Sequence, residues 1–207
     1  MKYLVRLVFS LLLMSCSSEQ KSNIEGLIID PNIKNEVEKY ITEAPELASL
    51  NQDMQAYHNS FHIESYKNDS LDVSSTDFSK KAPFKSFYYW HDGSLRIDGA
   101  YGIFGGFGFN IQISDQKATL YHMLSSDDFA TYAYQENDDF ILRLDVPCTA
   151  TKIVLSEIPD SSKQQLIYGY VEFKSNDFYS MSDSSTGERN KIRNNMKIYF
   201  KSGFVNL

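Results

Sequence analysis

The alternation of side chains along residues 101–113 limits what this chain can fold into more than any other feature. Large apolar residues occupy most odd positions of this segment, and glycine or amide residues occupy most even ones. Successive side chains of a β-strand point to opposite faces, so this period of two predicts a strand with one face in a core. The pair Gly105-Gly106 predicts a bulge or a sharp bend within it.

Shorter segments with strand character recur along the chain, separated by turn residues such as Asp92-Gly93. Strands are expected at 84–90, 95–98, 118–124, 129–134, 140–146, 152–156, 165–173 and 196–201. The polar segment 67–83 is expected to be a long loop or an irregular edge of the sheet, and the polar segment 174–190 is expected to be a loop. Short links between consecutive strands favour antiparallel pairing. The sequence therefore predicts a mainly β fold, an antiparallel meander of about seven to nine strands arranged as a sandwich or a barrel.

A short N-terminal helical segment is expected before these strands. Asp30-Pro31 combines a preferred N-cap residue with proline at the first helical position. Apolar residues follow at helical spacing, and Pro45 is expected to end or kink the helix. A second helical stretch is expected at about 46–57.

The first sixteen residues have the layout of an export signal. Lys2 and Arg6 supply positive charge, and a short apolar run follows at 7–14. This run is too short to cross a membrane, which takes about 20 apolar residues. It ends in Leu13-Met14-Ser15-Cys16, which resembles the lipobox of bacterial lipoproteins, although a small residue is commoner than methionine at the second of these positions.

The lipobox resemblance implies cleavage before Cys16 and lipid on its sulfur, with a further acyl chain such as palmitate on the new amino group. Two or more acyl chains anchor a protein stably to a membrane. Ser17 replaces the aspartate that retains enteric lipoproteins at the inner membrane, which implies the outer membrane and leaves open which side the protein faces. The alternatives are an ordinary secretory signal with an incidental cysteine, and a buried N-terminal strand.

The mature chain is expected to form one globular domain. Loss of Lys2 and Arg6 with the signal changes the formal charge from −7 to −9, which disfavours nucleic acid as a partner. Cys148 is left without an intramolecular disulfide partner once Cys16 carries lipid. The predicted divisions are a signal peptide at 1–15, a tether at 16–29 and a domain at 30–207, with helical structure at about 30–57 and antiparallel β-structure at about 60–201.

Four polar residues are weak candidates for metal or enzyme chemistry. His58 and His62 would share one face of a helix and could hold a metal if the fold supplied a third ligand. An envelope hydrolase or metal-dependent enzyme could use this pair together with His91 and Asp92. Lone histidine pairs are more often surface or capping residues, and the sequence predicts no catalytic residue and no cofactor.

The aromatic run at 84–90 is the candidate for ligand binding. Tyr88 and Trp90 share one face of the expected strand, and Phe87 and Tyr89 share the other. One face belongs to the core, and the other could be a stacking platform for a sugar or an apolar ligand. We assign ligand binding to Tyr88 and Trp90, with burial of all these rings in the core as the alternative.

The favoured function is therefore a membrane-anchored module that binds a small ligand, a glycan or another envelope protein. An enzyme and a purely structural or assembly lipoprotein are the competing classes. Four basic residues near the C-terminus share strand parity, and they could contact anionic lipid headgroups or form the solvated side of an edge strand. They are Lys191, Arg193, Lys197 and Lys201.

Overall fold

The computed structural model describes residues 24–48, 55–75, 81–102, 105–181 and 187–206. The chain is mainly β, as the sequence predicts, and a short helix precedes strand β2. The strands are β1 Leu27–Ile29, β2 Ile41–Glu43, β3 Gln55–Lys67, β4 Ser70–Ser75, β5 Lys81–His91, β6 Ser94–Tyr101, β7 Gly106–Ser114, β8 Lys117–Ser125, β9 Tyr132–Ala133, β10 Arg143–Leu155, β11 Ile167–Ser175, β12 Phe178–Met181 and β13 Arg189–Phe204. The helices are α2 Ile33–Tyr40 and α3 Pro45–Ala48.

Antiparallel pairing closes the sheet on itself. Among the described residues, eight strands follow one another around a ring in the order β3, β5, β6, β7, β8, β10, β11 and β13, and β13 pairs with β3 again. Five shorter strands attach outside this ring, and β1 joins β10 in parallel. The ring alone has eight strands, whereas the described sheet has 13, more than the seven to nine expected from the sequence.

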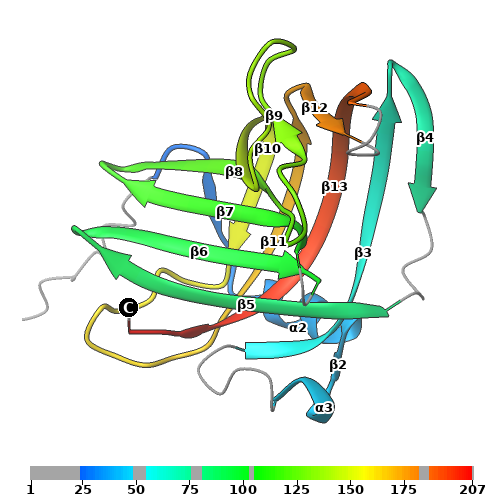
Figure 1. The fold of residues 1–207 in the computed structure, drawn as a ribbon. Coiled ribbons are helices and arrows are strands. Elements are labelled where there is room, and N and C mark those ends of the chain that lie inside the picture. Colours follow the sequence, from blue (N-terminus) through cyan, green and yellow to red (C-terminus); the bar gives the residue numbers. More distant parts are fainter. Residues whose placement is uncertain (1–23, 49–54, 76–80, 103–104, 182–186, 207) are drawn as a thin grey trace, which may run out of the picture.

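Two long strands bend so that each belongs to two layers. The first part of β3 pairs with β5 and the second part with β13. Strand β10 likewise passes from β8 to β11, with a register shift between Thr149 and Lys152 and a positive φ at Ala150. Such bends form the corners where strands switch sheets. Figure 1 shows the result: β5–β8 cross the front, which we call the front layer, and β11 and β13 run steeply behind, in the back layer.

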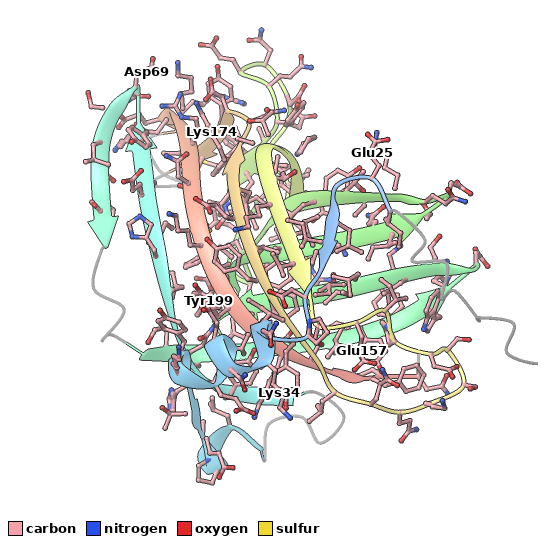
Figure 2. All side chains as sticks on the ribbon, turned by 180° about the vertical axis from the view of Figure 1, so that it is seen from behind. Glu25, Lys34, Asp69, Glu157, Lys174 and Tyr199 are labelled. Atoms are coloured by element: carbon pink, nitrogen blue, oxygen red, sulfur yellow. The ribbon has the colours of Figure 1, made fainter. Side chains whose placement is uncertain are left out.

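The core lies between the two layers and is filled by side chains. Aromatic rings from both layers meet there, and Phe109 of β7 lies 4.8 Å from Phe200 of β13 between ring centroids. Strands therefore present alternate side chains inward and leave two outer faces. The outer face of the back layer is partly covered by α2, whose Ile33 and Val37 pack on Val154 and Tyr170 (Figure 2).

The structure corrects several expected boundaries. The single strand at 101–113 is a hairpin, because Gly102, Gly105 and Gly106 all have positive φ and reverse the chain between β6 and β7. Ile103 and Phe104 lie outside the described residues. Segment 67–83, expected as a loop or an irregular edge, contains a turn at Asn68-Asp69 followed by β4, which among the described residues pairs only with β3 and so forms an edge. The expected loop at 174–190 contains β12.

The N-terminal expectations are also partly wrong. Asn32, and not Asp30 as expected, is the N-cap residue of α2. The Asp30 carboxylate accepts a hydrogen bond from the backbone N–H of Asn32 at 2.9 Å. Of the second helical stretch expected at about 46–57, the first residues belong to α3 and the last belong to β3, which begins at Gln55. Residues 49–54 lie outside the described residues. The last part of the expected tether, from Ile24, packs on the domain as β1. No helix in the described parts of the chain is long and apolar enough to cross a membrane, and Cys16 lies outside them.

Candidate ligand-binding site

Strand register gathers polar and aromatic side chains on the outer face of the front layer. Phe87 of β5 lies opposite Asp98 of β6, which lies opposite Asn110 of β7. The neighbouring row contains Ala100 and Gly108, which pair with each other. The face is hollowed beside Asp98, where Gly99 and Ala100 line a depression.

This depression, which we call the front hollow, has a volume of ≈ 360 Å³, which is large enough for a small ligand. Apolar and aromatic side chains form part of its wall, and charged groups of both signs stand around them. Its lining residues are Lys85, Phe87, Asp98, Gly99, Ala100, Tyr101, Gly102, Gly105, Met123, Ser125, Asp127 and Arg143.

Asp98 is the polar group that distinguishes this hollow. Its carboxylate accepts a hydrogen bond from the side-chain amide of Asn110, whose own oxygen accepts one from Gln112 Nε2 at 2.8 Å. Burial raises the pKa of Asp98, and the nearby carboxylate of Asp145 raises this pKa further, against the opposing effects of Asn110 and Arg96. A carboxyl group held in a hollow with a raised pKa is a candidate functional group.

An aromatic strip adjoins the hollow along β5. The rings of Phe87 and Tyr89 lie 6.0 Å apart between centroids, with 23° between their planes. Both residues are only partly buried, and they alternate with the inward-facing Ser86 and Tyr88. The strip therefore presents two neighbouring, partly exposed aromatic rings on the outer face.

The structure places Tyr88 differently from the ligand-binding role assigned to it. Tyr88 is fully buried, and its hydroxyl donates a hydrogen bond to the carbonyl of Gln165 at 2.9 Å. Trp90 is partly buried and packs against the same core. The parity of the aromatic run is as expected, but the face offered to solvent is the one carrying Phe87 and Tyr89.

The four candidate residues for metal or enzyme chemistry do not come together. His58 and His62 lie on strand β3 rather than on a helix, so four residues separate them by roughly 13 Å. His91 and Asp92 lie in the exposed β5–β6 turn, 3.3 Å apart between Nε2 and Oδ2. Within the part of the chain that the structure describes, no group of three or more His, Cys, Asp or Glu residues is placed to hold a metal ion.

His122, the remaining histidine of the chain, is fully buried between the layers. Its Nδ1 donates to the carbonyl of Gly108 at 2.9 Å, so its Nε2 accepts from the Asn194 amide, also at 2.9 Å. Burial lowers the pKa of His122 to about 4, and the ring is neutral at physiological pH. His122 therefore acts as a hydrogen-bonded core residue.

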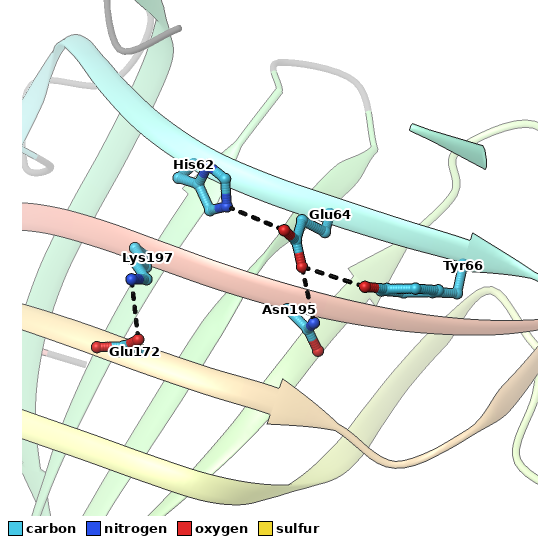
Figure 3. A network of polar contacts seen from close by, with 6 residues as sticks. All are labelled: His62, Glu64, Tyr66, Glu172, Asn195 and Lys197. Atoms are coloured by element: carbon cyan, nitrogen blue, oxygen red, sulfur yellow. Dashed lines mark hydrogen bonds and ion pairs between the residues drawn. The ribbon is translucent and has the colours of Figure 1, made fainter. Parts of the chain in front are cut away.

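The outer face of the back layer carries a second polar cluster (Figure 3), which also borders a shallow hollow. The Glu64 carboxylate lies 3.8 Å from His62 Nε2 and accepts hydrogen bonds from Asn195 at 3.0 Å and Tyr66 at 3.3 Å. The Asn195 hydrogen bond lowers the pKa of Glu64. The Glu64 carboxylate is therefore satisfied by its neighbours, which is typical of a surface ion pair and its hydrogen bonds.

The basic residues of β13 belong to this back face and not to an edge strand, because β13 is paired on both sides. Lys191 Nζ lies 2.6 Å from the Asp69 carboxylate, and Lys197 Nζ lies 3.1 Å from that of Glu172. Their charges are therefore partly neutralised within the protein.

Sequence reasoning missed Asp98, Asn110 and Arg143 as members of one site. The small and polar even positions of 101–113 were the available signal, since they mark an outer face with room beside it. The chain matches no protein-family model, no curated protein and no solved structure. The case for a site therefore depends on the geometry of the front layer.

Proposed function

We propose that this protein is a lipid-anchored lipoprotein of the bacterial cell envelope that binds a glycan on the outer face of its front layer. One observation carries the proposal. The half-buried carboxylate of Asp98, held by Asn110, stands in a hollow directly beside the partly exposed ring of Phe87.

This combination suits a sugar. A carboxylate and an amide can accept and donate hydrogen bonds to neighbouring hydroxyl groups, while an aromatic ring stacks on the apolar face of a sugar ring. A few fixed polar groups within an otherwise apolar lining are the usual means of orienting a small ligand.

The strand pairing argues against a peptide bound by strand addition. That mode requires a free sheet edge. Each of β6, β7 and β8 has a partner strand on both sides, so the site lies on the face of a sheet and offers side chains rather than backbone groups.

The anchor supports an envelope location. The proposal takes the lipobox resemblance at Cys16 as the attachment point and the outer membrane as the destination. A glycan ligand would then be a component of the envelope or of material reaching it from outside.

The test is binding of the full-length, lipidated protein in detergent micelles to an array of neutral and acidic glycans. We expect binding that Asp98→Asn and Phe87→Ala each weaken by at least about tenfold. Asp92→Asn is the matched control, because the Asp92 side chain is 91% exposed in a turn away from the hollow. Absence of binding to every glycan would contradict the proposal, and release of new reducing ends during incubation would favour a hydrolase instead.

A further inference from the structure

We infer that the ligand is a neutral oligosaccharide, and that at least two consecutive sugar units lie along β5 and β6, from the front hollow to Tyr89. This inference depends on the proposed function and defines its ligand class. It is carried by the part of the outer face beyond the hollow.

The same pair of side chains, an aromatic ring opposite a polar group, is repeated along the β5–β6 hairpin. Phe87 lies opposite Asp98, and two residues further along the hairpin Tyr89 lies opposite Arg96. An outward ring beside an outward polar group therefore occurs twice, with a strand period of roughly 6.6 Å. A repeated pair of this kind fits a ligand that is itself a repeat, with one unit for each ring.

The length of the outer face from the front hollow to Arg96 also favours more than one sugar unit. Ala100, at the floor of the hollow, is four residues from Arg96 on the same strand, which corresponds to roughly 13 Å. A single sugar ring held in the hollow does not extend over that distance. The Phe87 and Tyr89 rings are only 6.0 Å apart, so the aromatic strip continues from the hollow without a gap.

The second row also carries polar side chains, since Arg96 lies opposite Tyr89 on one side and Gln112 on the other. Gln112, opposite Arg96 on β7, donates to Asn110 and so joins the two rows into one polar network. A second sugar unit over Tyr89 would lie beside these groups.

The balance of charge on this face favours a neutral chain over a uronic acid polymer. Three basic and three acidic side chains stand in and around the face, although the chain as a whole is acidic. They are Lys85, Arg96 and Arg143 against Asp98, Asp127 and Asp145. The face therefore has no excess of positive charge to select an anionic polymer.

The experiment is calorimetric titration of the full-length, lipidated protein in micelles. The probes are glucose, mannose, galactose and N-acetylglucosamine series of one to six units. We expect affinity for at least one series to rise by at least about tenfold between one and three units, which is about 1.4 kcal/mol, and then to level off. Tyr89→Ala should abolish this rise and leave the affinity for the single sugar within about twofold.

Tyr134→Ala is the matched control, because Tyr134 is exposed in a loop outside the site, and it should keep the full length dependence. Equal affinity for one and three units, unchanged by Tyr89→Ala, would overturn the inference while leaving glycan binding intact. Tighter binding of oligogalacturonate than of every neutral chain would overturn its neutral character. Failure of all sugars to bind would remove the proposed function as well. Binding of peptides from a casein digest, without binding of any sugar, would also remove it.

Discussion

The side-chain amide of Asn110 donates a hydrogen bond to the carboxylate of Asp98 across the β6–β7 pair, on a face of the sheet that is open to solvent. Asp98 nevertheless has a raised pKa, because burial and the Asp145 carboxylate outweigh this bond and Arg96. An acid whose folded pKa is raised binds more protons in the folded state, so its ionisation at neutral pH costs stability. This relationship is expected where function rather than folding maintains a residue.

Asp98→Asn should therefore increase stability while weakening ligand binding. The amide oxygen of the new residue can still accept from Asn110, and the unfavourable charge is removed. We expect the free energy of unfolding at pH 7 to rise by up to about 1 kcal/mol, measured by urea denaturation. The gain should shrink as the pH falls toward 4, because the wild-type carboxyl then becomes protonated. A loss of stability at pH 7 would indicate a structural role for the charge.

His122 should make the protein less stable in mild acid. Its pKa of about 4 in the folded state lies below its ordinary value of 6.5, so the unfolded state binds the proton first as the pH falls. Stability from this residue is complete above pH 6.5 and is lost between 6.5 and 4, by about 3 kcal/mol. Urea denaturation across this range should show a weaker pH dependence in His122→Gln, whereas His91→Gln, which removes an exposed histidine, should behave as the wild type does.

Gly108→Ala should be strongly destabilising for a purely steric reason. A Cβ at Gly108 would lie 1.9 Å from the carbonyl oxygen of Gly99 and 2.8 Å from Ala100 Cα, and both are backbone atoms that cannot rotate away. We expect a loss of about 3 kcal/mol. Gly93→Ala is the comparison, since nothing lies within 4 Å of its Cβ and only its φ of +75° opposes alanine, which should cost about 1 kcal/mol. Equal thermal shifts in the two variants would contradict this account.

Cys148 should react slowly in the folded protein. Burial raises the pKa of its thiol to about 12, despite a hydrogen bond from the backbone of His122. In a Cys16→Ser variant, where Cys148 is the remaining cysteine, alkylation by iodoacetamide at pH 8 should be at least about 100-fold slower than for a free thiol. Unfolding in urea should restore the ordinary rate, and fast alkylation without urea would show that the site opens readily.

Cys16→Ala should move the protein from the membrane fraction to the soluble fraction, because acyl chains supply the membrane affinity. Fractionation of cells that express the variant measures this directly. Cys148→Ala should leave the distribution unchanged. Retention of Cys16→Ala in the membrane fraction would contradict the lipobox interpretation.

The sequence was informative where a pattern depends on neighbouring residues alone. Alternation placed Phe109 and Ile111 on the core side, and they are fully buried. It could not separate β6 from β7, because a glycine hairpin keeps the same alternation on both sides of the turn. The reversal depends on positive φ at Gly102, Gly105 and Gly106, which side-chain periodicity does not reveal.

The candidate site was harder to predict, because it depends on register between strands. Asp98 and Asn110 are twelve residues apart and become neighbours only when the hairpin aligns them. The parity of Tyr88 and Tyr89 was predictable, but which of them faces inward is decided by how β5 packs against the back layer. Closure of the sheet determines which of the two residues faces the core, and the alternation of neighbouring residues alone does not reveal it.

The attachment of Glu25 to the β7–β8 turn fixes the end of the domain at which the N-terminal chain enters. Its N–H donates to Gln116 and its carbonyl accepts from Ala118, so the chain enters the domain at the end of the front layer seen on the left of Figure 1. The front hollow lies at the opposite end of those strands, beside Ser125, roughly 23 Å along β8 from Ala118. With lipid on Cys16, the front hollow would occupy the end of the front layer that is remote from the membrane attachment, and Tyr89 would lie nearer to that attachment.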